Sequence, residues 1–118
     1  MKHFVLDPDR RVVEADLLTW GRWVATCENR EVARTEVGHL LVLTLFAGID
    51  ISFGDGPPAF FETRVLDGCN ELECLESGSW DEAITGHEAL AERWTCWADG
   101  AWRAAQRMLA LRGERWSV

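Results

Sequence analysis

Three side chains have the types that general acid–base catalysis uses, namely His87, Asp50 and Glu62. A histidine titrates near neutral pH and a neighbouring carboxylate can orient its ring, so the three could serve a small enzyme in a pocket beside the Gly54–Pro58 loop. His87, however, lies among apolar residues spaced as on one face of a helix, where a histidine is usually buried and structural. We favour the structural role and assign no catalytic residue.

Sequence motifs of known enzyme chemistry are absent. The chain has no Gly-x-Ser-x-Gly, no His-Glu-x-x-His and no dinucleotide-binding glycine pattern. The segment Phe53–Pro58 lacks the lysine of a phosphate-binding loop, and its two glycines and two prolines favour a rigid turn. We therefore expect no cofactor and favour a protein without enzymatic activity.

Cysteine spacing gives little support to a metal site. Cys69 and Cys74 are separated by four residues, which is wider than the two-residue spacing typical of zinc knuckles. A zinc site would require Cys27, Cys96 or a histidine to converge on this pair. We expect four reduced thiols and no metal.

Charge is distributed very unevenly along the chain. The net charge is −8, and residues 65–92 contain eight acids and neither Lys nor Arg. This block repels a phosphate backbone, so sequence-specific nucleic-acid binding is not expected, whereas a protein with a basic surface is the better electrostatic match. The expected partner-binding residues are Asp67, Glu71, Glu73, Glu76, Asp81 and Glu82.

The pattern of apolar residues and turn signals predicts one α+β domain over residues 1–118, with a small antiparallel sheet of four to six strands and two to three helices packed on it. Strands are expected at Phe4–Leu6, Val12–Glu14, Glu31–Val37, Leu40–Phe46, Phe61–Val65 and, more weakly, around Leu72 and Cys74. Helices are expected after Asp16 and after Ser79, because both residues are good N-caps. The run Leu40–Phe46 is apolar at both parities, which predicts a central strand covered on both faces.

The C-terminal segment 99–118 is a candidate helical extension. Asp99-Gly100 either separates Ala101–Leu111 from the preceding helix or lies within one continuous helix. The apolar side of this segment comprises Ala101, Trp102, Ala105, Met108 and Leu109, a second side holds Arg103, Gln106 and Arg107, and Arg112, Arg115 and Trp116 follow. Such a helix can bind a membrane surface, a partner's groove or a second copy, with Trp102, Arg103 and Arg107 as contacts. More often it covers its own core, which is the role we expect.

The amino-acid sequence of several segments resembles that of a family of short uncharacterised proteins from bacteriophages and prophage-bearing bacteria. The similar segments are Asp16–Trp23, Gly48–Asp50, Phe53–Pro58, Phe61–Thr63 and Gly86–Glu88. The likeness covers residues 6–94, and residues 97–118 extend beyond the usual family end. The resemblance implies a phage context and a protein that occupies the surface of a host protein.

Together these features predict a non-enzymatic interaction protein, in one version an acidic inhibitor of a host defence or nucleic-acid-handling protein. The alternatives are the His87, Asp50 and Glu62 enzyme and an oligomeric assembly component. The first residues are charged, and no apolar run approaches the roughly 18 residues of a membrane span, so we expect a cytoplasmic protein of a bacterial host.

Overall fold

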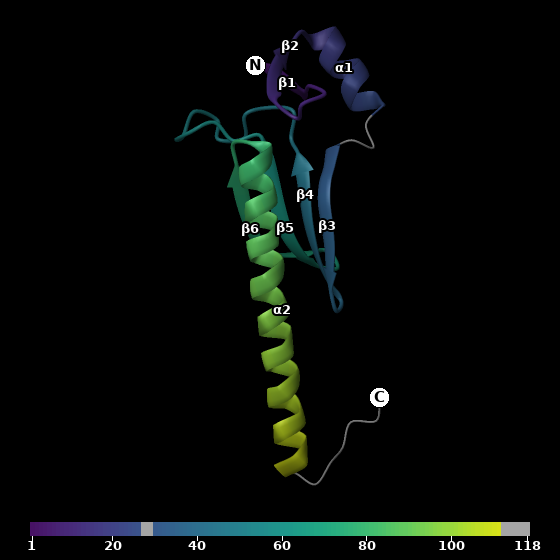
Figure 1. The fold of residues 1–118 in the computed structure, drawn as a ribbon, viewed down its shortest axis with the longest axis vertical. Coiled ribbons are helices and arrows are strands. Elements are labelled where there is room, and N and C mark those ends of the chain that lie inside the picture. The colour runs from purple at the N-terminus through teal and green to yellow at the C-terminus, as the bar shows by residue number, and fades with distance from the viewer. Residues whose placement is uncertain (27–29, 112–118) are drawn as a thin grey trace.

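The computed structural model describes residues 1–26 and 30–111, and their architecture confirms the α+β class. The elements are β1 (His3–Leu6), β2 (Val12–Ala15), α1 (Leu17–Ala25), β3 (Glu31–Val37), β4 (Leu40–Phe46), β5 (Phe61–Asp67), β6 (Asn70–Ser77) and α2 (Trp80–Leu111). β1 and β2 form a two-stranded antiparallel sheet, and β3 to β6 form a four-stranded antiparallel sheet in sequence order. Figure 1 shows the first sheet and α1 above one end of the second, along which α2 runs.

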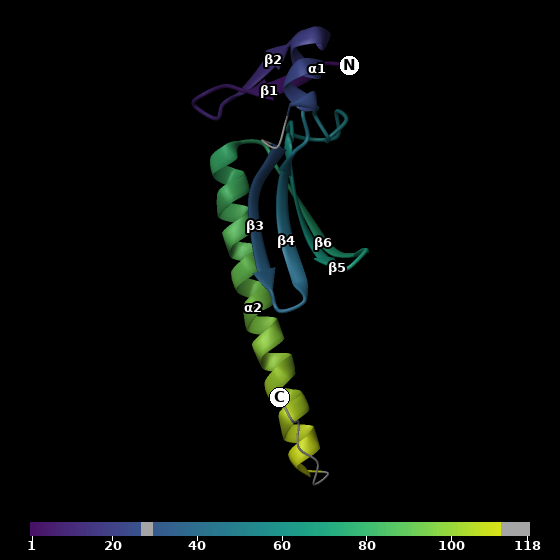
Figure 2. The same cartoon turned by 90° about the vertical axis from the view of Figure 1, so that its right-hand side faces the viewer.

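The four-stranded sheet has one face covered by α2. Side chains alternate between faces along a strand, and Leu40, Val42, Thr44 and Phe46 of β4 are all buried toward the helix. Leu41, Leu43 and Leu45 point the other way and are only half-buried. The expectation that this strand is covered on both faces was therefore wrong: within residues 1–26 and 30–111, Figure 2 shows no element over the second face.

The core consists of two apolar clusters separated by a polar layer. One cluster is built around Phe46, Phe61 and Ala83, and it also receives side chains from the first sheet and α1. The other is built around Val37, Leu40, Val42, Val65 and Leu90. Thr44, Thr63 and His87 are buried between them. The first cluster thus joins the N-terminal hairpin and α1 to the main sheet.

Local signals set the start of each helix. The Asp16 carboxylate accepts a hydrogen bond from the Thr19 amide at 2.8 Å at the start of α1. At the start of α2, the Ser79 hydroxyl accepts from the Glu82 amide at 3.2 Å, and the Glu82 carboxylate accepts from the Gly78 amide. Both predicted caps are confirmed.

The second helix is continuous over 32 residues, with Asp99 and Gly100 inside it. Ala98 is its last residue that packs against the core. Residues 99–111, about 20 Å of helix at 1.5 Å per residue, extend beyond the end of the sheet (Figures 1 and 2). The expectation that this segment covers its own core was therefore wrong. The radius of gyration is 18.7 Å, against about 13 Å for a compact domain of this size.

Candidate functional site

His87 lies inside the polar layer of the core. Its Nδ1 is 2.8 Å from the Thr44 hydroxyl and its Nε2 is 2.8 Å from the Thr35 hydroxyl, while Thr44 and Thr63 are hydrogen-bonded to each other at 2.6 Å. Burial lowers the pKa of His87, so the ring is neutral at pH 7, with one nitrogen donating and the other accepting. The residue is 4% exposed. Its two ring nitrogens are used to satisfy a buried network, which is a structural role.

The three residues of the alternative enzyme site do not meet. Asp50 lies in the loop between β4 and β5, where its Oδ1 accepts hydrogen bonds from the Ser52 amide and hydroxyl and from the Ala59 amide. The Ser52 hydroxyl contributes most to lowering the pKa of Asp50. Glu62 alternates with Phe61 and Thr63, which face α2, so it points from the opposite face of the sheet to His87. No single pocket holds His87, Asp50 and Glu62.

Glu62 instead belongs to an ion network on the open face of the sheet. Arg64 Nε lies 2.8 Å from the Glu62 carboxylate and 3.2 Å from that of Glu71, and the Cys74 thiol donates to Glu62 at 3.2 Å. Burial, followed by the Glu62 carboxylate, raises the pKa of Cys74 to about 12. The Glu62, Glu71 and Cys74 ligand atoms are close enough to hold an ion, but Arg64 already bridges the two carboxylates and the thiol keeps its proton. The cluster is therefore satisfied by the protein's own cation.

Three other predicted partner-binding acids have structural partners. Glu73 contacts Arg93 and accepts a hydrogen bond from Trp94 Nε1 at 2.9 Å, and the Arg93 contact lowers its pKa most. Glu82 belongs to the cap of α2, and Asp67 lies 3.6 Å from His39. Of the six predicted acids, Glu76, Asp81 and Glu82 have no ion pair within residues 1–26 and 30–111, and Glu82 is engaged by the cap instead.

The helix carries a line of acids that the sequence interpretation did not single out. At about 100° per residue, its four members lie within roughly 40° of one another, on the side of α2 turned away from the sheet. We call this line the acidic ridge, and it consists of Asp81, Glu88, Glu92 and Asp99. All four are exposed, and in the described part of the chain none of them is in an ion pair. The spacing of seven, four and seven residues is the signal that could have revealed the ridge.

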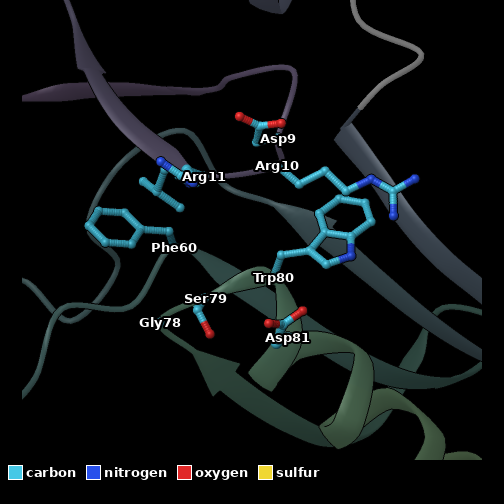
Figure 3. Close-up of a pocket in the computed structure, with 9 residues that line it drawn as sticks. Asp9, Arg10, Arg11, Phe60, Gly78, Ser79, Trp80 and Asp81 are labelled. Atoms are coloured by element: carbon cyan, nitrogen blue, oxygen red, sulfur yellow. The ribbon is translucent and has the colours of Figure 1, made fainter.

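A cavity of about 700 Å³ lies between the β1–β2 turn and the start of α2 (Figure 3). The guanidinium of Arg10 lies 4.6 Å from the centre of the Trp80 ring, and Asp9, Arg11 and Asp81 also line the space. Arg10 has φ +64°, a conformation that non-glycine residues seldom adopt. The charges of the lining balance, and no histidine or cysteine is among the lining residues. Its lining offers the carboxylates of Asp9 and Asp81 and the Ser79 hydroxyl, which is engaged in the cap of α2.

The predicted second contact surface separates into two parts on the helix. Arg103 and Arg107 are exposed on one side, and Trp102, which is 44% exposed, lies about 100° around the helix from Arg103. The predicted residues Arg112, Arg115 and Trp116 lie outside the described residues. So does Cys27, whereas Cys69, Cys74 and Cys96 are exposed free thiols.

None of the described helices is long and apolar enough to cross a membrane. Comparisons with family models, with curated proteins and with solved structures find no match to this chain. The resemblance to phage proteins therefore stays a prediction.

Proposed function

We propose that this chain is a non-enzymatic interaction protein that binds the basic surface of a partner protein through the acidic ridge of α2. The observation that carries the proposal is the alignment of Asp81, Glu88, Glu92 and Asp99 over about 27 Å of one exposed helix face, with none of the four in an ion pair among the described residues.

The ridge is a rigid display of negative charge over most of its length. Ala83, His87 and Leu90 are buried against the sheet on the other side of the helix, and they fix the backbone that carries the first three acids. A preformed row of carboxylates loses less conformational freedom on binding than acids on a loop would. Closely spaced carboxylates accept charge-assisted hydrogen bonds from Arg and Lys and accelerate association with a basic surface.

Proteins that bind nucleic acids have basic surfaces that could accept the acidic ridge, because these surfaces bind phosphates. We extend the proposal to such a partner, with the chain acting as an acidic inhibitor, as the phage-like segments imply for a host defence protein. The proposal rests on the ridge. Two of the three acids of β6 are already engaged, Glu71 by Arg64 and Glu73 by Arg93.

A charge-reversal pair tests the ridge. The bait Glu88→Lys/Glu92→Lys reverses the charge in the middle of the acidic ridge. Lysine is as good a helix former as glutamate, and both positions are far from the cap and the cavity. The matched control Glu14→Lys/Glu36→Lys reverses two exposed acids on β2 and β3, and so carries the same net charge. Quantitative capture from a bacterial lysate should retain a partner on the native and control baits and lose it, by at least tenfold, on the ridge variant.

Equal retention on the ridge and control baits would contradict the proposal. A partner lost from both variants alike would indicate a response to net charge alone and would also contradict a defined interface. Melting of each bait, followed by circular dichroism, checks that a lost interaction does not reflect a lost fold.

A further inference from the structure

The C-terminal end of α2 carries an apolar face with no sheet beneath it. Up to Ala98 this face packs on the core, and beyond Ala98 the same side of the helix continues into solvent. Trp97 is 55% exposed and Met108 is 62% exposed, which is unusual for large apolar side chains on the core-facing side of a helix. We define this overhang stripe as Trp97, Ala101, Ala105, Met108 and Leu109 together with Ala98, the half-buried residue at which contact with the core ends.

The overhang stripe is free of charge and symmetric in sequence. Its residues fall within about 120° of the helix circumference, while Asp99, Arg103 and Arg107 all lie on the other side. Its members are placed symmetrically about position 103, so that in an antiparallel pair Trp97 meets Leu109, Ala98 meets Met108 and Ala101 meets Ala105. Large side chains then oppose large or small ones, and alanines near the centre allow the two helices to approach closely.

We propose that the occupant of the overhang stripe is a second copy of this chain, paired antiparallel about a two-fold axis that crosses the stripe at the level of position 103. A two-fold interface is made of the same patch on both copies, and a stripe that is symmetric about its own centre meets this requirement.

The position of the sheet selects the antiparallel direction. The sheet packs on the same side of α2 that carries the overhang stripe, so it occupies the space that a parallel partner helix would need. In the antiparallel arrangement each described helix reaches only to the level of residue 95 of the other copy, so it passes the last turn of the sheet-packed part, whereas a parallel partner would meet the sheet along its whole length.

Charge favours the same direction. Each chain has a net charge of −8, and antiparallel pairing places the two acidic sheet domains at opposite ends of the dimer, whereas a parallel pair would bring them side by side. The acidic ridge lies on the far side of α2 and stays exposed. A helix pair of this length is smaller than a typical stable interface of about 800 Å² per partner, so the dimer should dissociate on dilution.

The experiment uses the full chain in sedimentation velocity from about 1 to about 500 µM, a range that covers affinities from micromolar to submillimolar. The mass should rise from that of a monomer toward that of a dimer. Small-angle X-ray scattering of the dimer should give a maximum dimension of about 110 Å, since two molecules of 64 Å would overlap over about 20 Å.

A matched pair of variants tests the interface. Ala105→Glu places a charge in the overhang stripe, and Gln106→Glu places the same charge on the neighbouring position outside it. We expect Ala105→Glu to weaken dimerisation at least tenfold and Gln106→Glu to change it less than twofold, with unchanged melting of both dilute monomers. A monomeric mass at every concentration, an undisturbed dimer of Ala105→Glu, or a dimer no longer than one molecule would each overturn the proposal.

Discussion

The two parts of α2 have the same periodicity and different surroundings. Residues 80–98 bury Ala83, His87 and Leu90 against a four-stranded sheet, whereas residues 99–111 include no buried residue. The apolar side runs without interruption through both parts. An apolar stripe at helical spacing therefore predicts that one face of a helix is buried, but it does not show whether the residues that bury it belong to the same chain.

The largest expected difference between the two parts concerns two leucines of the same helix. Leu90 is 5% exposed, and Leu90→Ala should reduce the free energy of unfolding by about 2–5 kcal/mol, because it removes core contacts and leaves a cavity. Leu111→Ala should cost less than about 0.5 kcal/mol in the monomer, since that side chain is 84% exposed. Urea unfolding at submicromolar concentration provides the measurement, and equal losses for the two variants would refute the distinction.

Two glycines of α2 give a second, smaller test. A Cβ at Gly86 would lie 2.6 Å from Cδ2 of Leu75 on β6, while a Cβ at Gly100 would meet nothing within 4 Å. Gly100→Ala should stabilise the helix by up to about 1 kcal/mol through backbone propensity. Gly86→Ala gains the same propensity, but the Leu75 side chain, which is 38% exposed, has to turn away from the new methyl group, so a smaller gain than at Gly100 is expected.

Thermal and urea unfolding should therefore show Gly86→Ala to be the less stable of the two variants. Equal stabilisation by both substitutions would mean that Gly86 and Leu75 are packed less closely than described.

The smallest effect concerns the pH dependence of the free energy of unfolding, and it comes from His87 in the sheet-packed part of α2. Burial lowers the pKa of His87 from the model-peptide value of 6.5, so the unfolded chain takes up a proton that the folded chain does not. The stabilisation from a neutral His87 is complete above about pH 6.5 and is lost as pH falls from there toward the folded pKa.

Native protein should therefore lose more stability between about pH 7.5 and 5.5 than the His87→Gln variant does, as measured by urea unfolding. An NMR titration of the native protein in which His87 protonates at or above the usual histidine value would contradict the buried network.

Much of the fold could be predicted from local signals. Asp16 and Ser79 mark the helix starts because their side chains bond to nearby amides, and alternation in Phe61–Val65 marks a strand with one buried face. The prediction that the strand Leu40–Phe46 is covered on both faces was wrong. Apolar residues at both even and odd positions are typical of such a strand, but here one face is only half-buried. Coverage depends on elements far away in the chain, which local patterns do not specify.

The candidate site was predictable in part. The acidic block is visible in the sequence, but its division into paired and unpaired acids is not. Arg64 lies on β5 and reaches Glu71 across the β5–β6 register, and Arg93 reaches Glu73 from the helix. The acidic ridge follows from helical spacing alone and could have been predicted from Asp81, Glu88, Glu92 and Asp99.

Hydrogen exchange along α2, compared at low and high protein concentration, tests most directly the claim that one part of the helix is covered by its own sheet and the other by a second copy. Amides of residues 84–97 should be protected equally at both concentrations. Amides of residues 100–110 should exchange fast in the dilute protein and become protected in the concentrated one. Fast exchange of residues 100–110 at every concentration, or strong protection of them in the dilute monomer, would contradict the account.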